Sequence, residues 1–169
     1  MKQAIAGVVT PDQAETQIMT VWPSIGAIAP GRWVGSMCGI RAGIGNVLTI
    51  GNLMAAALIP FALLLFFGGL APGVCRRYTL TNRRLIVRKG LTGVDERWVS
   101  LDNFDAIDIK VLPGQEWFPC GEMIFRKGAL ETFRISGVPH PEPFKQTCLK
   151  AQRAYSSVRK IAQHQHVTA

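Results

Sequence analysis

The chain has 169 residues, 48% of them hydrophobic, and a formal net charge of +8. This length allows one domain of ordinary size with appendages. Its four cysteines, Cys38, Cys75, Cys120 and Cys148, form no closely spaced pair. A zinc site needs thiolates and imidazoles in clustered pairs, so this spacing excludes a zinc finger and predicts no metal site. Scattered cysteines are typical of reduced thiols in a domain that faces the cytosol.

The positive charge lies almost entirely in the second half of the chain. Only Lys2, Arg32 and Arg41 precede residue 75, whereas sixteen Lys and Arg and nine Asp and Glu follow it. A basic domain attracts phosphate groups, either on lipid head groups or on nucleic acid. Charge alone does not decide between these two ligands, but a neighbouring apolar segment favours the lipid.

The first segment, residues 1–41, is not expected to carry a cleaved signal, because its apolar stretch is short and acidic residues follow it. Its second part is broken by prolines and glycines. There, Trp22 and Trp33 accompany Arg32 and Arg41. Because indole rings favour the head-group layer, we expect Trp22 and Trp33 to be interfacial anchors. This part then lies along the membrane or packs on a partner; a second crossing, with a cytoplasmic N-terminus, is the alternative.

Residues 42–75 contain no charged side chain, and their centre reads VLTIGNLMAAALIPFALLLFFGGL. A helix rises ~1.5 Å per residue, so about 20 apolar residues cross a hydrocarbon core of ~30 Å. A chain of this size cannot bury so apolar a helix on every side. We therefore predict a transmembrane segment over residues 42–75. One tilted helix is favoured over a re-entrant hairpin that bends near Pro60.

Six cations follow this segment directly and are called the basic cluster below. They are Arg76, Arg77, Arg83, Arg84, Arg88 and Lys89. Because cytoplasmic loops of membrane proteins carry an excess of Lys and Arg, the cluster predicts that the following domain is cytoplasmic. The same six residues are the candidate lipid- or partner-binding site. Each cation near an anionic surface adds about 1 kcal/mol, which salt screens.

From residue 76 the hydrophobic pattern changes to period two, interrupted by turn residues. Strands are predicted over residues 78–81, 85–89, 96–101, 105–112, 121–128 and 130–136. Asp95 and Glu96 are interpreted as solubilising turn residues. A helix over residues 142–162 follows, with apolar side chains at steps of three and four, and residues 163–169 form a tail. Residues 76–162 are thus expected to form a curled antiparallel sheet capped by a helix.

The motif YTLTNRR at residues 78–84, the meander after it, and SGVPHPEPF before a terminal helix resemble the bacterial membrane-linked pleckstrin-homology-like (PH-like) family. The resemblance covers about half of the chain, from residue 75 to residue 162. It implies an α+β, mainly β fold, in which a hydrophobic segment precedes a PH-like barrel. It also implies no catalytic residues.

The residues themselves offer no catalytic arrangement. His140 lies in a proline-flanked turn, and His164 and His166 lie in the tail, away from any nucleophile motif. Asp105 and Asp108 are three residues apart on a predicted strand and point to opposite faces. The cationic strands also lack the aromatic residues that stack single-stranded nucleic acid. We therefore expect no enzyme activity, no cofactor, no small-molecule substrate and no nucleic-acid partner.

Two functions remain. In the first, which we favour, the chain is a scaffold or accessory subunit in a bacterial inner (plasma) membrane. It docks on other integral membrane proteins of a larger complex through its membrane helix and a barrel edge. Trp98, Trp117 and Phe118 are candidate contacts. In the second function, the basic cluster binds the anionic head groups of membrane lipids.

Overall fold

The computed structural model describes residues 15–40, 42–44, 48–69, 76–90 and 93–167. All of its strand pairs are antiparallel. In chain order, the elements are β1 (Gln17–Val21), the 3-10 helix η1 (Ile25–Ala27), α1 (Ala29–Cys38), β2 (Gly43–Ile44), β3 (Leu48–Thr49), α2 (Ile50–Gly69), β4 (Arg76–Thr81), β5 (Arg84–Lys89), β6 (Val94–Ser100), β7 (Ala106–Lys110), β8 (Cys120–Lys127), β9 (Leu130–Pro139) and α3 (Pro141–Val167).

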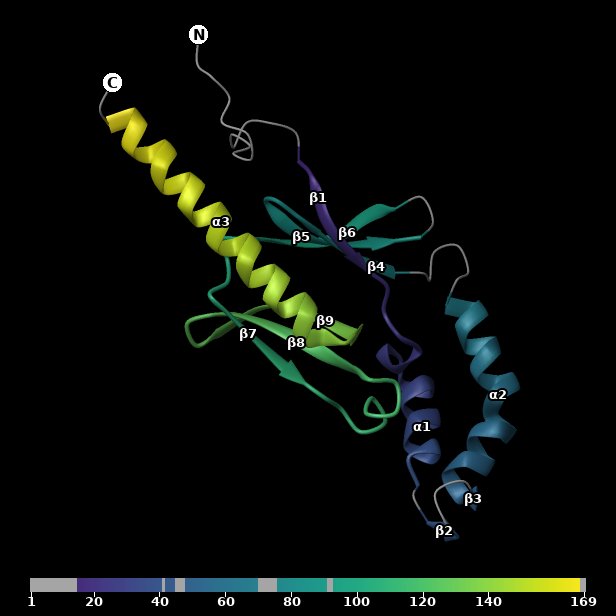
Figure 1. Cartoon of the computed structure of the whole chain (residues 1–169). Coiled ribbons are helices and arrows are strands. Elements are labelled where there is room, and N and C mark those ends of the chain that lie inside the picture. The colour runs from purple at the N-terminus through teal and green to yellow at the C-terminus, as the bar shows by residue number, and fades with distance from the viewer. Residues whose placement is uncertain (1–14, 41, 45–47, 70–75, 91–92, 168–169) are drawn as a thin grey trace.

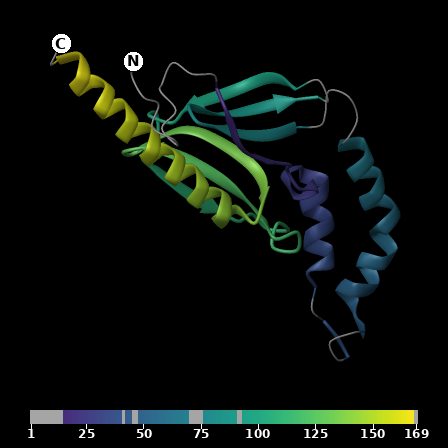
Figure 2. The same cartoon turned by 45° about the horizontal axis from the view of Figure 1, so that its top comes forward.

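Two antiparallel sheets and the C-terminal helix make up the folded body, called the barrel below. The strand order is β1-β4-β5-β6 in the first sheet and β7-β8-β9 in the second. Figures 1 and 2 show the two sheets stacked, with α3 running along the gap between them. This arrangement confirms the predicted PH-like fold class. The six predicted strands correspond to β4–β9, with ends that differ by three residues or fewer.

The first strand of the first sheet, β1, precedes the apolar segment in the chain. The sequence pattern does not predict this strand. β1 pairs with β4 in a register that places Val21 opposite Tyr78. The sheet therefore includes residues 17–21, which lie outside the sequence-based domain range of 76–162. The apolar segment is an insert between two neighbouring strands of one sheet.

This insert forms a helical hairpin beside the barrel. α1 runs away from the barrel, the short β2–β3 ladder turns the chain, and α2 returns (Figure 1). Gly51 N donates to Ile40 O at 3.0 Å and Ile50 N to Ala42 O at 2.7 Å, which holds the start of α2 close to the end of α1. α2 continues through Pro60. The alternative of a hairpin that turns at Pro60 is therefore wrong, because α2 is one helix on both sides of that residue.

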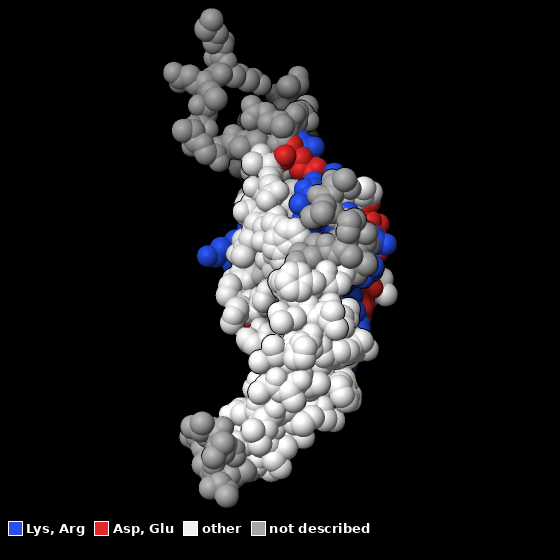
Figure 3. Space-filling model, turned by 90° about the vertical axis from the view of Figure 1, so that its right-hand side faces the viewer, with Lys and Arg blue, Asp and Glu red and all other residues white. Residues whose placement is uncertain are grey.

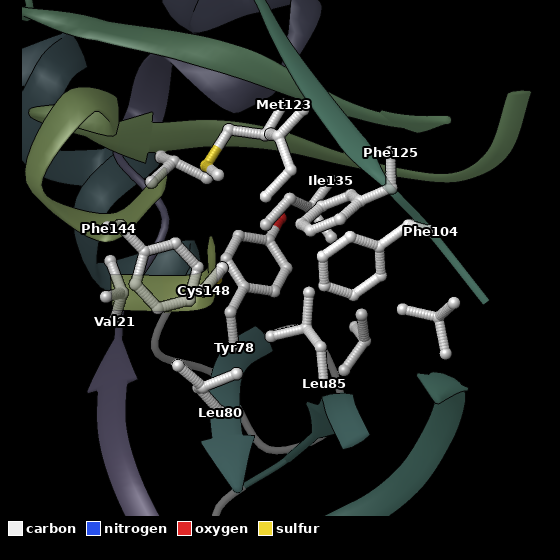
Figure 4. Packing of buried hydrophobic residues seen from close by; sticks show 14 of the residues in the cluster. Val21, Tyr78, Leu80, Leu85, Phe104, Met123, Phe125, Ile135, Phe144 and Cys148 are labelled. Carbon is white, nitrogen blue, oxygen red and sulfur yellow. The ribbon is translucent and has the colours of Figure 1, made fainter. Parts of the chain in front are cut away.

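The hydrophobic core lies between the two sheets and α3 (Figure 4). Tyr78 points into it from β4, and its hydroxyl donates to Ser136 O of β9 at 2.7 Å. Burial raises the pKa of Tyr78 above its ordinary value, because the phenolate would lose its hydration. Phe125 and Phe104 pack edge to face, with ring centroids 5.0 Å apart. These contacts join β4, β8, β9 and the β6–β7 loop in one core.

α3 covers this core with the apolar stripe that the sequence predicts. Phe144 and Cys148 are buried, and Tyr155 packs against the same cluster two turns further along. Burial raises the pKa of the Cys148 thiol to about 12, so the side chain stays protonated and behaves as a small apolar group at neutral pH. α3 continues beyond residue 162 to Val167, so most of the predicted tail is helical.

Close contacts join the hairpin to the barrel. The side chain of Gln115, in the β7–β8 loop, is fully buried and its Nε2 donates to Gly26 O at 3.1 Å. Gly35 of α1 lies so near Gly114 that an added Cβ would collide with the Gly114 carbonyl. Phe118 packs at the same place, against Gly26 and Gly35. The hairpin is therefore packed directly against the barrel through these residues.

Gly137→Ala is expected to destabilise this junction by about 2–5 kcal/mol. Gly137 has a φ of +67°, which costs a residue with a side chain about 1–2 kcal/mol. Its Cβ would also lie 2.7 Å from Ala27 Cα, and such overpacking adds about 1–3 kcal/mol. Thermal unfolding of the full chain in detergent measures the loss.

Gly128 provides the matched control for this substitution. Its φ is +60°, but a Cβ there would have no atom within 4 Å. Gly128→Ala should therefore lose only the conformational part, about 1–2 kcal/mol. Equal losses for the two variants would contradict the close approach of η1 to β9.

Candidate functional site

The basic cluster lies on the hairpin formed by β4 and β5. The strand register places Arg76 opposite Lys89 and Arg77 opposite Arg88. Arg83 lies in the turn between the two strands. Like charges that face each other across a strand pair are unfavourable unless carboxylates lie between or beside them.

Carboxylates of β6 pair with two of these cations. Arg76 binds Glu96 through two hydrogen bonds, Nη2–Oε1 at 2.8 Å and Nε–Oε2 at 3.0 Å. Arg88 Nε donates to Asp95 Oδ1 at 2.9 Å. Asp95 and Glu96 are thus strand residues that pair with Arg88 and Arg76, and their interpretation as turn residues is wrong.

A third cation of the cluster, Arg84, is paired with a residue that precedes β1. Its Nε and Nη2 donate to the two carboxylate oxygens of Glu15, both at 2.8 Å. The hydrogen bond from Arg84 holds the pKa of Glu15 below its ordinary value, and the same bond raises the pKa of Arg84. Thr81 also donates to Glu15, at 2.8 Å. Arg76, Arg84 and Arg88 are therefore each ion-paired with a carboxylate of the same chain.

The predicted tryptophan anchors lie at two different places. Trp22 directly follows β1 and is 47% exposed, with the Arg77 guanidinium carbon 6.0 Å from its ring centroid. Trp33 lies on α1 and is 53% exposed. Lys89 is exposed at the end of β5. The structure therefore groups Trp22 with the basic cluster, whereas Trp33 belongs to the hairpin.

An open groove of about 580 Å³ lies between β6 and β9. These strands are the outermost members of their respective sheets, so each has one edge that pairs with no other strand in the described part of the chain. Trp98 of β6 is 57% exposed, and Arg84 lies over its ring at 5.6 Å. On the β9 side, Arg97 of β6 lies over Phe133 at 5.4 Å. The groove thus combines two strand edges with aromatic side chains.

A second pocket of about 790 Å³ lies between the hairpin and the β7–β8 loop. Ser36, Cys38 and Asn52 line it from the hairpin, and Glu116 and Trp117 line it from the loop. Trp117 is 42% exposed. Three aromatic contacts are predicted from the sequence. Trp98 lines the groove and Trp117 lines this second pocket. Phe118 packs between the hairpin and the barrel, against Gly26 and Gly35.

The surface of α2 is apolar and uncovered. Leu64, Phe67 and Leu53 are each more than 60% exposed. Figure 3 shows the side on which α2 lies, with white surface along the helix and charged atoms gathered at the edges and above it. By length and composition, residues 50–68 form the one helix within the described ranges that is long and apolar enough to cross a membrane.

The two carboxylates considered above as catalytic candidates make contacts within the second sheet. Asp105 Oδ2 accepts a hydrogen bond from Gly128 N at 2.9 Å, and Asp108 pairs with Arg126 at 2.9 Å. His140 is an exposed residue with a φ of +42° at the start of α3. Among the described residues, no group of three or more His, Cys, Asp or Glu is placed to hold a metal ion. The groove and the surface of α2 are therefore the candidate functional surfaces.

The groove could not have been identified from the sequence. Trp98 falls within a predicted strand, but the sequence does not show that β6 ends its sheet or that β9 lies beside it. Glu15 was missed as a partner of the basic cluster, since 69 residues separate it from Arg84 and no motif links the two.

Comparison with known proteins places the chain in a family. The family model described as "Bacterial PH domain" matches residues 24–152, which is more than half of the chain and includes the hairpin. No curated protein and no solved structure matches the chain. Two antiparallel sheets and a C-terminal helix agree with this match, and domains of this type are generally non-catalytic. The chain therefore belongs to the bacterial PH domain family.

Proposed function

We propose that this chain is a non-catalytic docking protein anchored in a bacterial inner membrane. The α1–α2 hairpin inserts in lipid, and the barrel on the cytoplasmic side binds an extended segment of another integral membrane protein within a larger complex. The observation that carries the proposal is the groove between β6 and β9, where two unpaired strand edges lie beside an exposed tryptophan.

Membrane anchoring is supported by the composition and exposure of α2. Twenty residues without a charge present large apolar side chains to the surroundings, and a soluble protein seldom exposes such a surface. The cations that directly follow the helix favour a cytoplasmic barrel. α2 lies on one side of the molecule, so lipid can cover it while the groove remains open (Figure 2).

Docking is supported by the backbone at the groove. An outermost strand presents unpaired N–H and C=O groups, and an extended peptide satisfies them by adding a strand. Aromatic side chains beside such an edge supply the apolar contacts on which most binding energy depends. Trp98 and Phe133 occupy these positions on the two sides of the groove.

Head-group recognition by the basic cluster is less well supported, because Arg76, Arg84 and Arg88 are engaged with carboxylates of the same chain. Binding a phosphate group at these three positions would require the ion pairs to break. Generic attraction of a basic surface to anionic lipid is compatible with docking.

Trp98→Ala is expected to weaken partner binding by on the order of 30-fold, because truncating a central aromatic contact costs about 2 kcal/mol or more. A photo-cross-linking amino acid at position 98 of the full chain, activated in cells, should give one discrete adduct with a second integral membrane protein. The same reagent at Trp117, which lies outside the groove, is the control and should not give that adduct.

Two results would count against docking in the groove. One is identical adducts from positions 98 and 117; the other is a monodisperse full chain with no adduct at either position. Lipid recognition has its own measurement, which is the anionic lipid retained by the detergent-purified chain in native mass spectrometry. Loss of that lipid in the Arg77→Ala/Lys89→Ala variant, without any adduct at position 98, would favour head-group recognition.

A further inference from the structure

We infer that residues 22–75 enter and leave the bilayer through the same face, so that β1 lies on the same side as the rest of the barrel. The inference rests on the membrane anchoring proposed above. It replaces the single tilted span that the sequence favours with a re-entrant hairpin formed by α1 and α2.

The first step is the pairing of β1 with β4, the strands that flank the insert. Thr20 lies opposite Thr79, and their Oγ1 atoms are 3.3 Å apart. Directly before the first residue of β1, Asn82 N donates to Thr16 O at 3.0 Å, and Thr16 N donates to Asn82 Oδ1 at 3.1 Å. The pairing therefore extends along the whole of β1.

The second step is that β1 is an integral part of the barrel. Val21 is 8% exposed and belongs to the same buried cluster as Tyr78 and Leu80. Upstream of β1, Glu15 makes its two hydrogen bonds to Arg84. Separating β1 from β4 would expose an apolar core residue and leave a row of backbone groups unpaired.

The third step is geometric. Neighbouring strands lie about 4.8 Å apart, whereas a hydrocarbon core is ~30 Å thick. A single crossing between residues 22 and 75 would place β1 and β4 on opposite faces of the bilayer, which their pairing forbids. The insert must therefore cross an even number of times or dip into one leaflet.

The hairpin has the composition that such a path requires. Its first arm, α1, contains Arg32 as its one charged residue, and the Arg32 guanidinium donates to Ala27 O at 3.3 Å, toward the barrel end of α1. Arg41 follows α1 in the connection between the two arms. The second arm, α2, contains no charge. α2 can therefore enter the hydrocarbon layer, and at ~1.5 Å per residue it is long enough for the connection that carries Arg41 to reach a head-group layer. The contact between Gly51 and Cys38 O keeps the two arms together at the far end.

A disulfide between Thr20→Cys and Thr79→Cys tests the inference in the membrane. Facing residues of antiparallel strands have Cα atoms within the range that a disulfide tolerates. In a full chain whose native cysteines are replaced by serine, oxidation of intact membranes should link most molecules, as seen by non-reducing electrophoresis and peptide mass spectrometry. The matched control is Thr20→Cys/Ser100→Cys, in which two strands separate the thiols; it should form essentially no bond.

Protease accessibility of tags at the two termini gives the second measurement. In sealed inside-out vesicles both tags should be digested, and in right-side-out vesicles both should be protected. A chain that pellets with membranes but shows its tags on opposite sides, or forms no 20–79 bond, overturns the inference and leaves the proposed anchoring intact. A chain absent from the membrane pellet overturns both.

Discussion

Replacing Ile59 and Leu63 together by arginine is expected to release the protein from the membrane. Both side chains lie near the middle of α2 and are 55% and 49% exposed, so they contribute little to packing within the chain. An arginine at the centre of a membrane helix costs about 2.5–3.5 kcal/mol on insertion scales, so two weaken insertion by about 5–7 kcal/mol. The measurement is the share of the full chain that stays in the pellet after an alkaline carbonate wash.

The matched control places the same two charges on the barrel. Val94 and Leu130 are 65% and 71% exposed on β6 and β9, outside the hairpin. Val94→Arg/Leu130→Arg should remain in the pellet as the unmodified chain does. If the α2 variant also remained, a partner protein rather than lipid would have to surround α2, and the proposed anchoring would fail.

The sequence predicts β4–β9 well because their signals are local. In β7, buried Ile107 alternates with the exposed Asp108, and in β5 the apolar residues lie between turn residues at both ends. The pattern of α3 is equally local, since Phe144 and Cys148 are one turn apart on one face. Periodicity of this kind needs no knowledge of the partner strand.

The sequence does not predict β1 or its consequence for the hairpin. The segment QIMTV is five residues long, and its burial increases only toward Val21. Its pairing depends on β4, about 60 residues further along the chain, so no local signal distinguishes it from an irregular connection. If β1 is not recognised, the whole domain follows the apolar segment in the sequence, and a single span is the simplest interpretation.

The ionic contacts of the basic cluster depend on the same long-range pairing. Arg76 meets Glu96 only because β4, β5 and β6 are adjacent and in register. The sequence gives the charged residues and their order. The pairing of Arg76 with Glu96, however, requires β4, β5 and β6 to be aligned. A sequence therefore overstates the free positive charge of a sheet whenever the carboxylates come from neighbouring strands.

The insertion of the hairpin also bears on the docking proposal. Because it is inserted between β1 and β4 and contacts the β7–β8 loop, the barrel is held to the hairpin at two places. The orientation of the groove relative to α2 is then set by the fold and not by a flexible linker. A partner in the same membrane would meet the groove at a fixed distance from the membrane surface, and this fixed position lowers the entropic cost of docking.

Phe125→Ala is expected to lower the free energy of unfolding by about 3–5 kcal/mol. Phe125 is fully buried on β8, and its ring packs edge to face on Phe104 at 5.0 Å and on Phe133 at 6.1 Å. Truncation leaves a cavity between the two sheets and removes both aromatic contacts. Denaturant unfolding of the full chain in detergent, followed by tryptophan fluorescence, measures the loss.

Two further variants make this expectation specific to Phe125. Phe125→Leu keeps most of the volume and should cost less than about 1.5 kcal/mol, so it will fold even if the alanine variant does not. Leu130→Ala, on a side chain that is 71% exposed, should change stability by no more than about 0.5 kcal/mol. Since Phe133 both supports Phe125 and lines the groove, Phe125→Ala should also loosen the β9 edge. Unchanged stability in the alanine variant would mean that the two sheets do not share this core.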